Sequence, residues 1–394
     1  MSEQTVKNAY TQLCFLSVFC SLKEQEPFQS FFAYCEKQTN SEKAKAYARF
    51  VCNLYEYAGG DLTAFVSRAV FESENAYIKS AASGKQVPKI IEEQAQKELK
   101  VLSFFASLTR EDFAKDMGVD EEELADFVSF NAYLGTAYQE RIQNIGKYGY
   151  GIFAANSMFR VSENGQIQPI ESADAVCLDH FIGYEEERAQ IIQNTKLLLS
   201  GKAAANALLF GDAGTGKSST VKAVANAFFF EGLRLIELRK DQLRALPSVM
   251  AKIANNPLKF IIFIDDLAFN KSNDEFSMLK AVLEGSASAK ADNAVIYATS
   301  NRRHIIKESF SDRDGDDVHV NDTLQETLSL SERFALVVRF QKPDKKLYLT
   351  IVEQLAKRSG LQISEELFVQ AEAYALRKGN RSARCAEQFI KSLV

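Results

Sequence analysis

The first half of the chain places apolar residues three and four positions apart, which is the period of amphipathic helices. The stripe that opens the chain consists of Val6, Tyr10, Leu13, Cys14, Ser17 and Val18. The apolar stretch 13–22 is too short to span a bilayer and follows no basic run, so we predict a core helix rather than a signal or a membrane segment. We expect residues 1–145 to form an all-α domain.

Helix start and stop signals divide this half into segments. Ser, Thr and Asp cap helix N-termini, Pro fits the first helical turn, and Gly ends helices. Such signals stand at Ser41, the pair Gly59-Gly60, Asp61, Pro88, and Thr109 with Asp112, which together resemble a capping box.

The pattern changes near residues 146–151. Two short apolar runs then flank Asn164-Gly165, which indicates a β-hairpin. From residue 182 onward, short apolar strands alternate with helical segments, which predicts a parallel sheet with helices on both faces. The expected strands cover residues 207–210, 233–238, 260–264, 294–298 and 335–340, and the expected final helices cover 345–358, 365–378 and 382–393.

We therefore predict an α/β protein with four regions. An acidic helical N-terminal domain covers 1–145, a linker with a β-hairpin covers 146–177, a core of alternating strands and helices covers 178–342, and a helical lid covers 343–394.

Charge is unevenly distributed between the two halves. Residues 1–175 carry 17 Lys+Arg against 24 Asp+Glu, whereas the remainder carries 30 against 28. Proteins that follow a phosphate backbone normally show a basic surplus. A nucleic-acid arm in the first half is therefore not favoured, and its many Phe and Tyr are better explained as helix-bundle core than as base-stacking platforms.

The six cysteines form no CxxC pair and have no nearby His that would complete a zinc site. Four lie among helical apolar positions, which predicts buried free thiols. This fits a reducing, cytoplasmic setting.

The string GDAGTGKS at residues 211–218 follows a predicted strand and leads into a predicted helix. Small residues let backbone N–H groups point at a polyphosphate, and the helix N-terminus adds positive potential. Lys217 would reach the β- and γ-phosphates of ATP, and the Ser218 hydroxyl would bind Mg²⁺. We assign nucleotide contacts to Gly211, Asp212, Ala213, Gly214, Thr215, Gly216, Lys217, Ser218 and Ser219.

Asp265 and Asp266 follow a continuous apolar run, which is typical of a parallel strand buried on both faces. Carboxylates at the C-terminal end of such a strand lie where α/β sheets bind ligands. We expect Asp265 to hold Mg²⁺ and Asp266 to orient and polarise the attacking water.

The next strand ends in polar residues that can hold the water or the γ-phosphate. Asn301 is the preferred candidate and Thr299 the alternative. Arg302 and Arg303 follow, and a subunit contact or an acidic loop explains them better than nucleic acid does.

Two further arginines come later. Arg333 precedes the last strand and would lie at the edge of the module, and Arg384 opens the last helix, from where it could fold back over the nucleotide.

This order of motifs resembles an AAA+ ATPase module over residues 178–394. The resemblance implies that Ile182, Gly183 and Tyr184 pack on adenine. It also implies that Lys217 and Ser218 are Walker A and that Asp265 and Asp266 are Walker B. Further, it makes Asn301 sensor 1, Arg333 an arginine finger and Arg384 sensor 2. The family's second Walker B acid is usually Glu rather than Asp.

A narrower resemblance is to a bacterial family of predicted AAA-type ATPases with a domain of unknown function. Five motifs carry it, at residues 211–219, 265–269, 279–285, 299–304 and 329–334. The Asp-Asp pair followed by an apolar residue is also similar to replication initiators and helicase loaders.

Three functions follow from these resemblances. We favour an oligomeric enzyme that couples ATP hydrolysis to remodelling of a protein partner recognised by the N-terminal domain. An ATP-switched loader or regulator acting on nucleic acid is the alternative, and a nucleotide-gated assembly with little turnover is the third.

Overall fold

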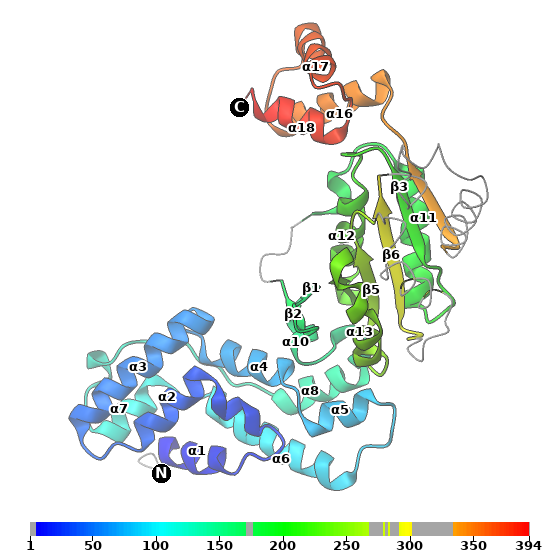
Figure 1. The fold of residues 1–394 in the computed structure, drawn as a ribbon. Helices are drawn as coiled ribbons and strands as arrows, with labels where there is room; N and C mark the ends of the chain where they lie inside the picture. Colours follow the sequence, from blue (N-terminus) through cyan, green and yellow to red (C-terminus); the bar gives the residue numbers. More distant parts are fainter. Residues whose placement is uncertain are drawn as a thin grey trace. The chain divides into compact units, whose positions relative to one another are not determined.

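The computed structural model describes residues 5–170, 176–267, 279, 283, 291–301 and 334–393. The chain divides into two compact units, Met1–Ala155 (the helical unit) and Asn156–Val394 (the sheet unit) (Figure 1). The sequence predicted that the helical domain ends at residue 145, whereas the compact helical unit continues to Ala155. No helix in the described ranges is long and apolar enough to cross a membrane.

The helical unit is all-α, as predicted. Its elements are α1 (Thr5–Cys14), η1 (Cys20–Glu24), α2 (Glu26–Cys35), α3 (Asn40–Ala58), α4 (Leu62–Glu72), α5 (Ala76–Ala82), α6 (Lys89–Ala106), α7 (Arg110–Met117), η2 (Glu121–Glu123), α8 (Leu134–Gln143), α9 (Ile145–Tyr148) and α10 (Ile152–Ala155). The predicted capping box is confirmed, because the Thr109 side chain accepts from Asp112 N–H while the Asp112 carboxylate accepts from Thr109 N–H. Asp61 caps α4, and Gly59, with φ of 60°, ends α3.

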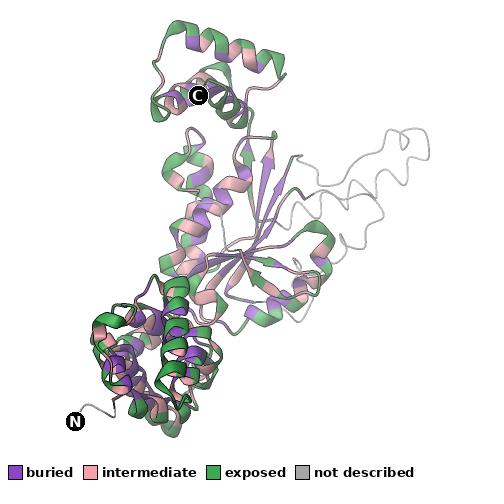
Figure 2. Ribbon diagram, turned by 90° about the vertical axis from the view of Figure 1, so that its left-hand side faces the viewer, coloured by how far each residue is buried: buried purple, intermediate pink, exposed green. Residues whose placement is uncertain are grey.

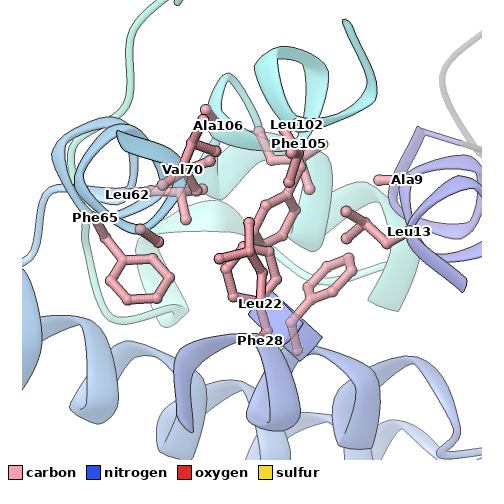
Figure 3. Packing of buried hydrophobic residues seen from close by; sticks show 14 of the residues in the cluster. Ala9, Leu13, Leu22, Phe28, Leu62, Phe65, Val70, Leu102, Phe105 and Ala106 are labelled. Carbon is pink, nitrogen blue, oxygen red and sulfur yellow. The ribbon is translucent and has the colours of Figure 1, made fainter. Parts of the chain in front are cut away.

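Aromatic rings fill the core of the helical unit. Phe28 and Phe105 meet with their ring centroids 5.2 Å apart, beside Leu22 and Leu102 (Figure 3). The interpretation of these Phe and Tyr residues as core is confirmed for the many that are fully buried, such as Phe31 and Tyr34.

The predicted core helix over residues 13–22 is wrong, because α1 ends at Cys14 and η1 begins only at Cys20. The cause lies on α6, where Glu98 accepts the backbone N–H groups of Ser17 and Phe19, each at 2.9 Å. Those N–H groups cannot then donate to helical carbonyls. A carboxylate distant in sequence therefore overrides the local helical pattern.

The prediction of buried thiols is also largely wrong. All six cysteines are described and free, but Cys14, Cys20, Cys52 and Cys177 are exposed. Cys385 is buried and Cys35 half-buried. Cys14 and Cys52 fall on the outer side of helices whose larger apolar residues, such as Leu13 and Phe50, fill the core.

The sheet unit contains one sheet, whose described strands run in the order β2-β1-β4-β5-β6-β3-β7. All neighbouring strands are parallel except β1 and β2. The strands are β1 (Met158–Val161), β2 (Ile167–Pro169), β3 (Ala207–Gly211), β4 (Leu233–Glu237), β5 (Lys259–Ile264), β6 (Ala294–Ser300) and β7 (Leu336–Phe340).

The predicted hairpin is present, but it is more than a linker. β1 pairs with β2 in antiparallel fashion and with β4 in parallel fashion, so that the hairpin extends the sheet. Asn164-Gly165 lies in its turn, where Gly165 has φ of 69°.

Helices cover both faces of the sheet. The crossover from β3 through α12 (Lys217–Ala227) to β4 moves toward the β2 edge of the sheet. The crossover from β4 through α13 (Leu246–Ile253) to β5 moves in the opposite direction, toward the β7 edge. Because such crossovers are right-handed, α12 and α13 lie on opposite faces. α11 (Glu185–Leu199) shares a buried apolar cluster with α12, and the strands between the helices are buried (Figure 2).

The chain ends in a small helical lid with a core of its own. It comprises α16 (Lys345–Arg358), α17 (Glu365–Arg377) and α18 (Ala383–Lys391), which pack through Tyr348, Ile351, Ala371 and Phe389. The described elements confirm the predicted fold class, with a parallel sheet covered by helices on both faces, a helical lid after it in the chain and an all-α domain before it. The remaining short elements are η3 (Leu178–His180), η4 (Phe229–Glu231) and η5 (Lys240–Ala245).

Candidate functional site

Three neighbouring strand ends meet at one edge of the sheet. The strands concerned are β3, β5 and β6 (Figure 1). β3 runs into the 211–218 loop, β5 is followed by Asp265 and Asp266, and β6 by Asn301. Parallel strands place their carboxyl ends together, and here they surround a cavity of about 220 Å³. The lining residues are Ala213, Gly214, Gly216, Lys217, Ser218, Ser219, Asp265, Asp266, Thr299, Asn301 and Arg384.

The backbone of the loop requires its glycines. A Cβ on Gly211 would lie 1.9 Å from the Phe340 carbonyl oxygen, and Gly211 has φ of 140°. Gly214 and Gly216 also have positive φ, at 77° and 91°. Among the described residues no side chain caps α12 at Gly216, which leaves the amides of that helix N-terminus available to an anion.

Lys217 is a buried cation, with 6% of its surface exposed. Its Nζ donates to the carbonyl oxygens of Gly211 (2.9 Å) and Asp212 (2.7 Å) and to Asn301 Oδ1 (3.2 Å). Burial lowers the pKa of this ammonium, and the surrounding carboxylates oppose that effect. An ammonium held by neutral oxygens can transfer to phosphate oxygens, which are stronger acceptors.

Ser218 and Asp265 form an oxygen pair suited to a hard cation. The Ser218 hydroxyl donates to Asp265 Oδ1 at 2.6 Å, and the Thr299 hydroxyl donates to the same oxygen. Mg²⁺ is usually held by one or two protein oxygens together with water and substrate phosphates. The donor set therefore fits Mg²⁺.

Asp266 adopts a left-handed backbone conformation, with φ of 52°. Its N–H donates to Thr299 Oγ1 at 3.0 Å, and its Oδ1 accepts from Asn301 Nδ2 at 2.9 Å. A non-glycine residue in this region costs about 1–3 kcal/mol, and such strain concentrates at functional sites. The strain aims an exposed carboxylate at the cavity.

The sequence analysis named Asn301 and Thr299 as alternatives. Both line the cavity, and they make different contacts. Asn301 bridges Lys217 and Asp266 through its two amide atoms. Thr299 contacts both aspartates. The tip of β6 therefore orders the cation and both carboxylates.

The helical lid reaches the loop through Arg384. Its N–H donates to the Gly214 carbonyl at 3.4 Å, and it lines the cavity. A Cβ on Gly214 would lie 3.0 Å from Ser382 Oγ, so the lid packs closely on the loop.

Ile182, Gly183 and Tyr184 lie where the lid meets the sheet and do not line the described part of the cavity. A Cβ on Gly183 would lie 2.6 Å from Leu347 Cδ1, and the Tyr184 hydroxyl donates to the Gln341 carbonyl at 2.6 Å. Their predicted role in packing on adenine stays a prediction.

Phe181 lies nearer to the loop and was missed by the sequence analysis. A Cβ on Gly216 would lie 3.6 Å from its ring, and the Arg188 guanidinium lies 5.5 Å from its centroid. The available signal was a large aromatic residue directly before the 182–184 segment and outside any strand.

Arg333, like Arg302 and Arg303, lies outside the described residues. The role of Arg333 as an arginine finger, and that of Arg302 and Arg303 in a subunit contact or an acidic loop, stay predictions.

The family model described as "Protein of unknown function (DUF815)" matches residues 154–394. No curated protein matches the chain. Among solved structures, a point mutant of RuvB from Thermotoga maritima is 15% identical, with 55% of this chain and 63% of that chain covered and a TM-score of 0.38. AMPPCP-bound DnaA from Aquifex aeolicus is 18% identical, with 56% and 64% covered and a TM-score of 0.39. The chain thus spans less than two thirds of the length of either protein. Sequence identities and TM-scores this low transfer no activity to it.

Proposed function

The chain belongs to the family described as "Protein of unknown function (DUF815)", and from the geometry of its cavity we propose that it binds ATP with Mg²⁺ and hydrolyses it. One observation carries this proposal. Lys217, Asp266 and Asn301 follow three different strands, are separated by up to 84 positions, and form one hydrogen-bonded chain around the cavity. A cation, an exposed carboxylate and an amide bridging them are what phosphoryl transfer to water needs.

Each residue has a separate task in this proposal. Lys217 and the amides of the 211–218 loop hold the β- and γ-phosphates, and Ser218 and Asp265 hold Mg²⁺, which neutralises charge on the phosphates. Asp266 accepts a hydrogen bond from a water molecule and orients it toward the γ-phosphorus. The new bond joins that phosphorus to the water oxygen as the bond to the β-γ bridging oxygen breaks, giving ADP and phosphate.

The test is ATP binding by Lys217→Ala, measured by calorimetry. We expect affinity to fall about 100-fold or more, because a desolvated charge pair with the phosphates is lost. Lys222→Ala is the matched control, since Lys222 lies on the same helix but faces Glu237 at 3.7 Å, and it should bind normally. Equal affinity in wild type and Lys217→Ala would contradict the proposal.

We further infer that hydrolysis is coupled to remodelling of a protein partner that the helical unit recognises, in a homo-oligomer. Two large aromatic side chains support a protein contact there, because Phe130 and Tyr133 have 61% and 82% of their surface exposed. The Asp266→Asn protein should retain ATP and hold the partner, which mass spectrometry of co-purified proteins would identify.

The alternative, a loader acting on nucleic acid, is tested by titrating the full chain with single- and double-stranded DNA at several salt concentrations. We expect no salt-dependent binding. The first 175 residues carry 24 acidic against 17 basic residues, so their net charge is negative and repels the phosphate backbone. Micromolar binding that weakens with salt would favour the loader. We retain the expectation of a cytoplasmic location, which a cell-fractionation experiment can test.

A further inference from the structure

Asp212 is the one acidic residue in the 211–218 loop, and its side chain bonds outside the loop. Its Oδ2 accepts from the Lys342 N–H at 3.0 Å, and its own N–H donates to the Phe340 carbonyl at 3.3 Å. Both its main chain and its side chain therefore attach to residues 340–342, the start of the link between β7 and α16.

A carboxylate is a poor choice for a loop that binds polyphosphate. Its charge repels the phosphates, and at the distances within such a loop the repulsion persists even in water. The backbone amides that hold the phosphates do not need it. The hydrogen bond from the Lys342 N–H is the contact that explains a carboxylate at this position.

The link at 340–342 carries the lid. Asp344 caps α16 by accepting from Leu347 N–H at 2.7 Å, so the lid begins directly after the link. The Lys342 side chain reaches the Gly379 carbonyl at 3.5 Å, close to the segment that leads to Arg384. The lid is thus joined to the loop at its start through Asp212 and near its end through Gly214.

The main chain of Asp212 also contacts the phosphate-binding cation. Its carbonyl accepts from Lys217 Nζ at 2.7 Å and from the Thr215 hydroxyl at 2.9 Å. One residue therefore bonds to the cation through its carbonyl and to the lid link through its carboxylate.

We propose that Asp212 is a positioning residue that couples phosphate binding to the position of the helical lid. The inference rests on the proposed ATP binding. When the Lys217 ammonium transfers to phosphate oxygens, the Asp212 carbonyl loses a strong partner. The resulting shift of Asp212 passes through its carboxylate to Lys342 and so to α16.

Two variants separate the hydrogen bond from the charge. Asp212→Asn keeps an acceptor oxygen but removes the charge, and Asp212→Ala removes both. Asp241→Ala is the control, because Asp241 is an exposed aspartate of the same unit whose partner is Arg239. The measurements are hydrogen–deuterium exchange of the full chain, without nucleotide and with saturating ATP and Mg²⁺, and ATP affinity by calorimetry.

Without nucleotide, we expect peptides covering residues 337–346 to exchange about threefold to tenfold faster in Asp212→Ala than in wild type, Asp212→Asn or the control. With ATP, protection of the lid at 345–393 should increase in wild type and Asp212→Asn but much less in Asp212→Ala. Both Asp212 variants should bind ATP a few-fold more tightly, because both lose the charge.

Three results would overturn the coupling. The first is equal exchange at 337–346 in all four proteins, which means that the hydrogen bond constrains nothing. The second is an equal ATP-induced gain in lid protection in Asp212→Ala and Asp212→Asn, which leaves Asp212 with an electrostatic effect alone. The third is a wild type that binds no ATP by calorimetry. That result removes the proposed function as well, and it is recognised independently of the exchange at 337–346.

Discussion

Glu98 in the helical unit and Lys217 in the sheet unit are both nearly buried charges, with 3% and 6% of their surface exposed. Glu98 accepts from the N–H groups of Ser17, Val18 and Phe19, the Ser17 hydroxyl and the Gln94 amide. Most of its partners are main-chain donors of the turn at residues 17–19, which Glu98 holds in shape. The partners of Lys217 are two loop carbonyls and one amide, which line the same cavity or adjoin it.

The difference separates structural charge from functional charge. A carboxylate whose oxygens are saturated by donors of its own fold stabilises that fold and has little hydrogen-bonding capacity left for a ligand. A cation beside a cavity, with a strained carboxylate and an oxygen pair around it, can exchange its partners. Substitutions in the helical unit should therefore change stability without changing turnover, and substitutions around the cavity should do the reverse.

The largest effect is expected at Arg333. If it is an arginine finger supplied to a neighbouring copy, Arg333→Ala should bind ATP normally but hydrolyse it about 10³–10⁵-fold more slowly. Steady-state phosphate release measures this. A surface ion pair would contribute under about 1 kcal/mol and nothing to turnover.

Mixing Arg333→Ala with Lys217→Ala should restore part of the activity. A mixed interface can combine an intact loop from one copy with an intact arginine from the other. Full activity in a wild type shown to be monomeric by analytical ultracentrifugation, or an unchanged rate in Arg333→Ala, would rule out the finger.

Asp266→Asn should lower hydrolysis by about 10²–10⁴-fold while ATP still binds. The amide keeps the shape and can still pair with Asn301, but it polarises water poorly. Thermal unfolding should stay near that of wild type, in line with a residue that is exposed and not part of the core. A wild-type rate in this variant would remove Asp266 from the chemistry.

Glu98→Ala should destabilise the helical unit by about 3 kcal/mol, because it leaves several buried N–H donors without an acceptor. Urea unfolding followed by circular dichroism measures this. Glu93→Ala, an exposed position on the same helix, should change stability by less than about 0.5 kcal/mol. Equal stability of the two variants would show that the turn at residues 17–19 does not depend on Glu98.

The stability of the helical unit should also depend on pH through Glu98. Burial raises its pKa, but the hydrogen bonds from Phe19, Ser17 and Gln94 outweigh burial and leave the pKa below its usual value of 4.5. Its contribution to stability is thus present above pH 4.5 and is lost as the pH falls further. The urea midpoint of wild type should decline more steeply below pH 4.5 than that of Glu98→Gln.

Much of the fold follows from local patterns. Helix α16 was predicted at 345–358 and occupies Lys345–Arg358, and the five strands of the core were each predicted within two residues at either end. Strong apolar runs bounded by Asp, Ser or Gly leave few alternatives. The segment at 15–19 could not be predicted, because the acceptor that breaks its helix is Glu98, about eighty positions away.

Residues of three motifs that the sequence analysis singled out line one cavity, whereas the roles assigned to them stay predictions. The residues at 211–218, 265–266 and 301 stand directly at strand ends, and parallel strands bring those ends together. The contacts of Phe181 with the loop and of Asp212 with Lys342 come from tertiary packing, which no spacing along the chain encodes.

The hairpin of β1 and β2 has a consequence for how the sheet unit can be separated from the rest. β1 occupies the side of β4 that would otherwise present a row of unpaired N–H and C=O groups, and the new edge strand β2 is short and carries Pro169. Short, proline-bearing edges resist pairing with other chains. A fragment beginning at residue 178 would expose the apolar strand β4 as an open edge and should self-associate. A fragment beginning at residue 156 keeps β1 and β2, which cover that edge, and should stay monodisperse under the same conditions.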